Sequence, residues 1–214
     1  MKPIILVRHA QSQHHVNGLT GGWTDTGLTD LGRRQAACLA SRLKHELEGV
    51  PVRFCCSDLK RALQTAEIVG REIGVTAQLV PGLREFNNGV AAGMLREEAD
   101  KIRREPAEPF IDWQPYPEAE TWRQFYGRVA KAMDHLIEEQ EELLLLVTHG
   151  GALVNIVAWW LQLDGEMLSK VSFNAHPTAI SVLYTDQWGS HELERLNDTA
   201  HLYAAGLAES LLPS

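Results

Sequence analysis

The chain has 214 residues, of which 44% are hydrophobic and 22% are charged. This composition excludes a disordered protein, and the length suits a single domain covering residues 1–214 better than two domains. The formal net charge of −8 provides no basic surface for nucleic acid or for an anionic membrane, so neither is expected as a partner. An anionic ligand must therefore be held by a local cluster of cations.

Nothing in the sequence predicts a membrane span or a secretion signal. No apolar run approaches the roughly 20 residues that cross a bilayer, and Arg8 interrupts the apolar N-terminus too early for a signal peptide. The three cysteines, Cys38, Cys55 and Cys56, are odd in number and two are adjacent, so no disulfide framework is expected. We therefore expect a cytoplasmic protein.

The first predicted element is a strand over residues 4–7, which reads Ile-Ile-Leu-Val and ends at Arg8 and His9. Such a continuous, largely β-branched run is typical of a central strand that is buried on both faces. Residues 9–28 then form a loop rich in Gly, Thr and Asn. Its length indicates a functional loop rather than a plain connection.

A strand between two helices follows this loop. Apolar residues at helical spacing predict a helix over residues 29–47, and Val-Arg-Phe-Cys-Cys at 52–56 predicts the strand. A second apolar stripe predicts a helix over 59–73, with Ser57 or Asp58 as its N-terminal cap. This alternation of strands and helices is typical of an α/β protein.

The middle of the chain is irregular. A weaker strand is expected at 77–80, and residues 83–120 contain several prolines with one helix predicted over 94–104. We interpret 83–120 as an insertion over one edge of the core. Residues 121–124, Thr-Trp-Arg-Gln, have the form of a capping box and predict the start of a further helix.

The last third of the chain contains another buried-looking strand. Residues 143–147 are entirely apolar and end at Thr-His-Gly-Gly, and a helix is expected over 152–163. Residues 179–185 and 191–196 then predict two antiparallel strands at the edge of the sheet. The whole pattern indicates an α/β fold with a mostly parallel central sheet.

Cationic or ionisable side chains follow three of the predicted strands. They are Arg8 with His9, Arg61, and His149. Ligands of open parallel sheets bind at the carboxyl ends of the strands, so these side chains are expected to share one pocket. Paired arginines bind phosphoryl oxygens well, which makes a phosphate group the expected guest. Neighbouring guanidinium charge would also keep His9 neutral, with a lone pair available to attack phosphorus.

Five motifs occur in order along the chain: Leu-Val-Arg-His-Ala at 6–10, Gly-Leu-Thr-Asp-Leu-Gly at 27–32, Ser-Asp-Leu-Lys-Arg-Ala-Leu-Gln-Thr-Ala at 57–66, Leu-Arg-Glu-Phe at 83–86 and Val-Thr-His-Gly-Gly at 147–151. In this order and spacing they resemble the histidine phosphatase superfamily, in its phosphoglycerate mutase-like branch. The resemblance covers about residues 4–185. It implies a three-layer α/β/α sandwich of the phosphoglycerate mutase-like type.

The resemblance also implies roles for particular residues. His9 would be the nucleophile that forms a phosphohistidine, and Glu85 would donate a proton to the leaving oxygen. Arg8, Arg61 and His149 would line the phosphate pocket and stabilise charge during transfer. The 83–120 insertion would lie over this active site, and neither a metal nor another cofactor is expected.

The chain departs from the family pattern at a few positions. Ala10 and Gln11 stand where relatives usually have Gly and Glu, so one carboxylate is lost. His15 stands where an asparagine usually touches the phosphate, and it can replace that asparagine as a donor. Ser12 is expected either to donate to a phosphate oxygen or to cap a turn. Gly21 replaces a side-chain amide, which predicts a roomier entrance to the pocket.

The sequence favours a phosphatase that hydrolyses a small phosphomonoester. Two alternatives remain: a cofactor-dependent phosphoglycerate mutase, and a non-catalytic module that binds a phosphorylated ligand. Residues 87–93 lack the Arg-Tyr-bearing insertion by which mutases resemble one another, and this favours hydrolysis. The natural substrate and the oligomeric state are not predicted. A metal at His14 and His15 is disfavoured, because no cysteine or acidic ligand accompanies them.

Overall fold

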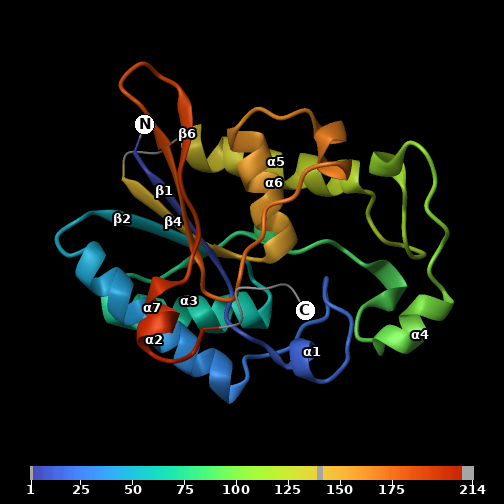
Figure 1. Cartoon of the computed structure of the whole chain (residues 1–214), viewed down its shortest axis with the longest axis horizontal. Coiled ribbons are helices and arrows are strands. Elements are labelled where there is room, and N and C mark those ends of the chain that lie inside the picture. Colours follow the sequence, from blue (N-terminus) through green and yellow to red (C-terminus); the bar gives the residue numbers. More distant parts are fainter. Residues whose placement is uncertain (1, 139–141, 209–214) are drawn as a thin grey trace.

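The computed structural model describes residues 2–138 and 142–208. Strands and helices alternate along the chain and form a layered molecule around one sheet (Figure 1). The strands are β1 (Ile4–Arg8), β2 (Val52–Cys56), β3 (Gln78–Leu79), β4 (Leu143–Thr148), β5 (Ile180–Thr185) and β6 (His191–Asp198). All six lie where the sequence predicts strands.

The α-helices connect these strands or cover the sheet. They are α1 (Gln13–Val16), α2 (Asp30–Glu46), α3 (Lys60–Ile73), α4 (Arg96–Lys101), α5 (Trp122–Glu138), α6 (Gly150–Trp160) and α7 (Ala200–Ala204). The short 3-10 helices are η1 (Pro81–Leu83), η2 (Gly89–Ala91), η3 (Phe110–Asp112) and η4 (Gly165–Ser169). In the part of the chain that the structure describes, no helix combines the length and apolarity needed to cross a bilayer.

The strands form one sheet in the order β3-β2-β4-β1-β5-β6. β1 through β4 run parallel to one another, whereas β5 pairs antiparallel with both β1 and β6. The predicted parallel centre and antiparallel C-terminal edge are both confirmed. Because β1 and β4 are neighbours, Arg8 lies opposite Thr148, and the residues that follow them emerge at the same edge of the sheet.

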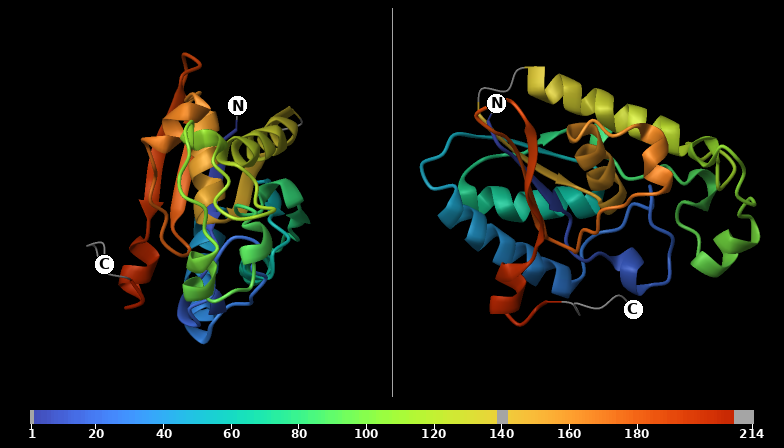
Figure 2. Two further views of the ribbon diagram at one scale, coloured as in Figure 1. Left: turned by 90° about the vertical axis from the view of Figure 1, so that its right-hand side faces the viewer. Right: turned by 45° about the horizontal axis from the view of Figure 1, so that its top comes forward.

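Helices cover both faces of this sheet, as the alternation of buried side chains along β1 requires. Ile4 and Leu6 point into a core formed with α5 and α6, and Ile5 and Val7 point into a second core formed with α2 and α3. Figure 2 (right) shows α5, in yellow, on one side of the strands and α2, in blue, on the other. The predicted three-layer α/β/α sandwich is therefore confirmed.

Two of the predicted helix starts are confirmed in atomic detail. The Gly32 amide donates to the Thr29 hydroxyl at 3.0 Å at the start of α2. The Thr121 amide donates to the side chain of Gln124 at 2.8 Å, and the Gln124 amide donates to the Thr121 hydroxyl at 3.2 Å. Such reciprocal bonds satisfy backbone donors that lack partners within the helix.

The predicted cap of α3 is wrong. Leu59 occupies the N-cap position, and the first helical amide, that of Lys60, donates to Oδ1 of the distant Asp25 at 2.7 Å. Ser57 and Asp58 have other partners, because Ser57 Oγ lies 2.8 Å from His149 Nε2 and Asp58 pairs with Arg84. Tertiary contacts therefore override the local capping preference of both side chains.

Two other helices differ from prediction in their bounds. α4 is shorter than the predicted 94–104, because the Arg104 amide donates to the carbonyl of Pro115 and not to a helical carbonyl. α6 begins at Gly150, two residues before the predicted start, and ends at Trp160. The glycine pair lowers helix propensity, yet the fold makes it the first turn of the helix.

Candidate active site

The carboxyl ends of β1 and β4 bring His9 and His149 together. Each histidine directly follows its strand, and the His9 amide donates to the Thr148 carbonyl at 2.8 Å. Their ring centroids are 5.1 Å apart, and both residues are almost fully buried. The sheet topology thus places two imidazoles, about 140 residues apart in sequence, in one buried cluster.

The hydrogen bonds of His9 fix where its proton lies. Nδ1 is 2.7 Å from the carbonyl of Ala10, which can only accept, so Nδ1 carries the hydrogen. Nε2 lies 3.1 Å from Nε of Arg61, which donates to it. Burial lowers the pKa of His9 well below its ordinary value, and the charges of Arg61 and its neighbours lower it further. The ring is therefore neutral at pH 7, with its lone pair on Nε2.

Arg61 is held by the loop that precedes α2. Its side chain lies in the first turn of α3, is 1% exposed and donates to the carbonyls of Gly22 at 2.7 Å and Thr24 at 2.8 Å. Burial lowers the pKa of Arg61 to about 10, whereas the nearby Glu85 carboxylate raises it. The guanidinium thus stays charged at neutral pH, with its Nε directed at His9.

His149 has one partner and one open nitrogen. Its Nε2 lies 2.8 Å from Ser57 Oγ, and its Nδ1 has no hydrogen-bond partner among the described residues. Burial lowers the pKa of His149 well below its ordinary value, and the charges of Arg61 and Arg8 lower this pKa further. Ser57 was expected only as a helix cap; its place directly after β2 is the sequence signal for its role beside His149.

Arg8 and His15 meet on the other side of His9. Nη1 of Arg8 donates to the carbonyl of Ala175 at 2.5 Å, and its Nη2 lies 3.2 Å from Nε2 of His15. The His15 ring stacks beside His9 with 5.6 Å between centroids. Burial lowers the pKa of His15 to about 4, with Arg8 as the next cause. The backbone amide of Ser12 donates to His15 Nδ1 at 3.1 Å.

Ser12 and His14 lie next to His15 in sequence and in space. Ser12 is the N-cap residue of α1, and its Oγ is 2.8 Å from Nδ1 of the buried His14. Burial lowers the pKa of His14 to about 3. Within residues 2–138 and 142–208, no three His, Cys, Asp or Glu side chains are arranged to hold a metal ion.

Glu85 is fixed at the N-terminus of α6. Its Oε2 accepts from the amide of Gly151 at 3.0 Å, and its Oε1 accepts from the amide of Phe86 at 2.9 Å. Its backbone carbonyl accepts from Trp23 Nε1 at 2.8 Å and from Arg128 at 3.1 Å. Because Gly151 lies two residues after His149, the carboxylate is anchored beside the histidine cluster.

Two cavities meet at Glu85. One, of about 440 Å³, is lined by Arg8 as well as Glu85, and the other, of about 430 Å³, extends under α4 and includes Gly21. Residues of 83–120 line both of them, so this segment lies beside Glu85 and, in the first cavity, near Arg8. Figure 1 shows this segment, in lime green, projecting at the right of the molecule.

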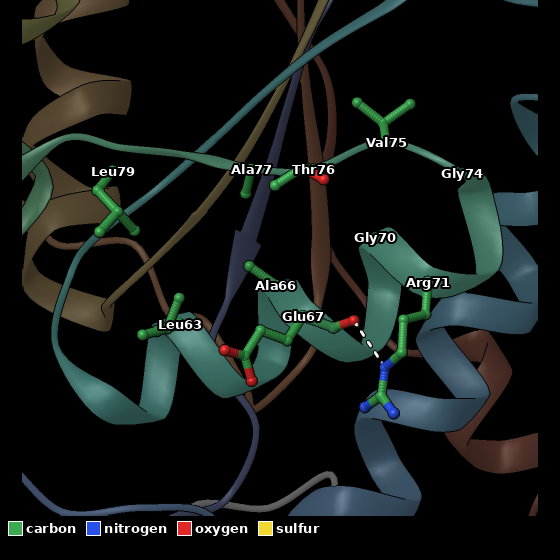
Figure 3. Close-up of a pocket in the computed structure, with 10 residues that line it drawn as sticks. All are labelled: Leu63, Ala66, Glu67, Gly70, Arg71, Gly74, Val75, Thr76, Ala77 and Leu79. Atoms are coloured by element: carbon green, nitrogen blue, oxygen red, sulfur yellow. Dashed lines mark hydrogen bonds between the residues drawn. The ribbon is translucent and has the colours of Figure 1, made fainter.

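A larger groove lies away from these residues. It measures about 650 Å³ and runs between α3 and residues 74–79 (Figure 3). Its walls are mainly apolar, and its charged lining residues are Glu67 and Arg71. None of the predicted site residues lines this groove, so the chemistry is assigned to the strand ends.

Sequence reasoning missed two residues that shape the loop over Arg61. Asn88 Oδ1 accepts from the amide of Trp23 at 2.9 Å, and the indole of Trp23 stacks against Arg84, whose guanidinium carbon is 4.7 Å from the ring centroid. Gly22 has a φ of +60°, and an added Cβ would lie 2.3 Å from Asn88 Oδ1. Nothing local in the sequence signals these contacts, because they join segments about 65 residues apart.

Comparison with known proteins agrees with this geometry. The family model described as the histidine phosphatase superfamily (branch 1) matches residues 4–199. The chain is 30% identical, over 98% of its length and 99% of the other's, to the Yersinia pestis protein named "Probable phosphoglycerate mutase GpmB". It is 28% identical to the broad-specificity phosphatase YOR283W of Saccharomyces cerevisiae, over 93% of this chain and 86% of that one.

A solved structure shares the fold. The alpha-ribazole phosphatase from Shigella flexneri superimposes with a TM-score of 0.76 at 26% identity, covering 92% of this chain and 96% of that one. These relatives are phosphatases or mutases, which supports a phosphatase-type enzyme. The chain belongs to the histidine phosphatase superfamily (branch 1).

Proposed function

We propose that the protein is a phosphatase that hydrolyses a small phosphomonoester through a phosphohistidine on His9. The observation that carries this proposal is the state of the His9 ring, which is buried, neutral and protonated on Nδ1. Its Nε2 lone pair then attacks phosphorus. A bond forms between Nε2 and phosphorus as the ester P–O bond breaks, and the departing oxygen takes a proton from Glu85.

The cations around His9 are suited to holding the phosphoryl group during its transfer. Arg8 and Arg61 come from different elements, and the charges of both act on His9. The charge that develops on the phosphoryl oxygens is stabilised by donors already in place, which is where enzymes gain most for this reaction. The open Nδ1 of His149 gives that ring one further position from which to bind a phosphoryl oxygen.

His15 acts as an additional donor to the phosphoryl group. Its Nδ1 accepts from the Ser12 amide, and its lowered pKa keeps the ring neutral, so its one proton lies on Nε2. Nε2–H and Arg8 Nη2–H are then two donors only 3.2 Å apart. An anionic oxygen placed against both would accept from each. In this way His15 replaces the asparagine that stands here in relatives.

The second half of the reaction regenerates the enzyme. Glu85, now ionised, removes a proton from water, whose oxygen attacks phosphorus and releases Nε2 of His9. The products are the alcohol and inorganic phosphate, and Glu85 is protonated again. No other reactant is needed.

A phosphoglycerate mutase is the second candidate, supported by the identity to GpmB. Both candidates form the phosphohistidine and differ in its fate. A mutase returns the phosphoryl group to an isomer of its substrate, whereas a phosphatase passes it to water. The similarity to a broad-specificity phosphatase supports hydrolysis.

The proposal is tested with a 32P-labelled phosphomonoester and a rapid alkaline quench, which preserves phosphohistidine. Wild-type protein should carry label that is lost in acid, and His9→Ala should carry none. The exposed His45 provides the control, because His45→Ala should label like wild type. Undiminished phosphate release by His9→Ala would refute the covalent route through His9, whereas binding of the ester without any phosphate release by the wild type would revive a non-catalytic phospho-ligand module.

A chase separates the two enzymes. Labelled protein is mixed with unlabelled 3-phosphoglycerate, and the label is followed into inorganic phosphate or phosphoglycerates. A phosphatase delivers the label to phosphate. Delivery mainly to 2-phosphoglycerate or a bisphosphoglycerate would establish the mutase.

A further inference from the structure

The cavity that Arg8 and Glu85 both line has walls from four distant parts of the chain. They are η3 in the insertion, the start of α5, the first half of α6, and the end of η4 with the segment that leads into β5. We call this space, of about 440 Å³, the leaving-group cavity. A phosphoryl group held by Arg8 and a proton donor at Glu85 require the leaving oxygen to lie between them. The rest of the leaving group must then extend into this cavity.

The leaving-group cavity combines aromatic and aliphatic walls with the uncharged polar side chains of Asn155, Ser172 and Asn174. Phe110 and Trp122 lie nearly parallel, with ring centroids 6.2 Å apart and planes 13° apart. Val154, Leu168 and Phe173 line the cavity as well, and each is half-buried. Phe110, Val154 and Leu168 belong to neither of the two main core clusters. Phe110 also packs against Trp113, and part of each of these three side chains faces the cavity.

Charge is scarce in this cavity. Among the described residues that line it, Arg8 and Glu85 are the only ionisable ones, and both already serve the transfer step. The neighbouring cavity contains Arg96, but Asp100 lines the same space and Arg96 Nε donates to the carbonyl of Leu19. A carboxylate on the substrate would lose its hydration in the leaving-group cavity, and the described lining provides no second cation to pair with it.

We infer that the substrate is a phosphomonoester whose leaving group is an uncharged alcohol that carries a flat ring. This inference rests on the proposed phosphatase function. The volume lies within the range of pockets that enclose ring-containing small molecules. The aromatic rings of the lining can stack on a ring of the leaving group, and the described lining holds no cation besides Arg8, which disfavours phosphoglycerates.

Three esters with alkyl leaving groups test this inference without a large difference in leaving-group chemistry. They are 2-phenylethyl phosphate, ethyl phosphate and 3-phosphoglycerate. We expect kcat/KM for the phenylethyl ester to exceed that for ethyl phosphate by at least about tenfold, because burying several apolar carbons is worth that much in an enzyme pocket. The kcat/KM for 2-phenylethyl phosphate should also exceed the kcat/KM for 3-phosphoglycerate by at least about tenfold.

Two variants tie the preference to the cavity. Phe110→Ala should lower the ratio of kcat/KM for phenylethyl over ethyl phosphate about tenfold, as loss of one aromatic wall predicts. Val154→Lys should lower the same ratio and raise the relative use of 3-phosphoglycerate, because it places a cation in the cavity. Trp188→Ala and Val50→Lys are the controls, since both residues are exposed and remote from the cavity lining.

The outcomes separate this inference from the proposed function. Equal rates for the three esters, or a preference for 3-phosphoglycerate, would overturn the inference while phosphatase activity stands. Failure of all three esters, with no labelled His9, would overturn both. Ratios in the two cavity variants that match those of their controls would also overturn the inference, because the preference would then arise elsewhere.

Discussion

Gly151 is the position where one methyl group should disable the proposed proton donor. A Cβ added there would lie 2.3 Å from Oε1 of Glu85 and 3.1 Å from Cε1 of Phe125. Ordinary contact begins near 3.4 Å, so the Glu85 carboxylate of Gly151→Ala must move by about 1.1 Å. The same movement stretches its 3.0 Å hydrogen bond to the Gly151 amide.

A displacement of this size predicts a large but selective loss. Misplacing a catalytic group by about 1 Å costs on the order of 100-fold, within the 100- to 10,000-fold that general acids contribute. We therefore expect kcat/KM for an alkyl phosphate such as 2-phenylethyl phosphate to fall about 100-fold in Gly151→Ala. The rate with p-nitrophenyl phosphate should fall no more than about threefold, because nitrophenolate leaves without needing a proton.

Gly150 provides the matched control. A Cβ there would lie 3.6 Å from Nε of Arg8, which is ordinary contact, and it would leave Glu85 in place. Both glycines lie in the first turn of α6, so alanine favours the helix by up to about 1 kcal/mol at either position. Steady-state kinetics with both esters, and a thermal melt of each variant, complete the measurement. Equal slowing of the two esters, or no slowing of the alkyl ester, would refute Glu85 as the acid.

Three further predictions concern binding, pH and stability. His15→Ala should raise KM for phosphomonoesters several-fold. His15→Asn should keep KM close to that of the wild type, because the asparagine amide also donates a hydrogen bond. Inhibition constants for inorganic phosphate check both variants. The pKa of buried His14 is lowered to about 3, so the unfolded chain binds more protons below pH 6.5 and the free energy of unfolding falls as pH drops from 6.5 towards 3. His14→Gln should remove about 1 kcal/mol of the fall between pH 6.5 and 5.5 in urea titrations. An added Cβ at Gly127, within α5, meets open space, so Gly127→Ala should raise the free energy of unfolding by about 0.5–1 kcal/mol and Tm by about 2–4 °C. An added Cβ at Gly82 would lie 2.6 Å from the Cβ of Ala132, so Gly82→Ala should lower both quantities.

Each of these has an outcome that contradicts it. Equal phosphate inhibition of His15→Ala and wild type would remove His15 from phosphate binding. An unchanged pH profile in His14→Gln would mean that His14 is not kept neutral by the fold. A lower Tm for Gly127→Ala would show that the helix tolerates no side chain there, against the open space that surrounds it.

The strands and main helices were predictable because their signals are local. The apolar run at 4–7 and the one at 143–147 can be satisfied only in the middle of a covered sheet, and both became central strands. α2 begins where the sequence predicts, and Thr29 caps it, because a hydroxyl three residues before a free amide is a purely local arrangement. The position of Arg8 and His9 at a strand end likewise followed from the sequence pattern.

What joins those strand ends was decided by tertiary structure. The tautomer of His9 depends on the carbonyl of Ala10 and the guanidinium of Arg61, which belongs to another helix. Ser57 Oγ accepts from the amide of Leu59 and also meets His149, because β2 and β4 are adjacent in the sheet. A sequence lists these donors and acceptors, but only their arrangement in space shows which of them meet.

The leaving-group cavity is the clearest case of this difference. Its walls come from η3, α5, α6 and the segment after η4, and no periodicity or motif links them. The order of side chains along the chain determined the fold class and the candidate residues for phosphate binding, because each of those depends on a strand and the residues that follow it. The shape and charge of the space beside Glu85 depend on how distant segments pack, and packing is a property of the folded chain alone.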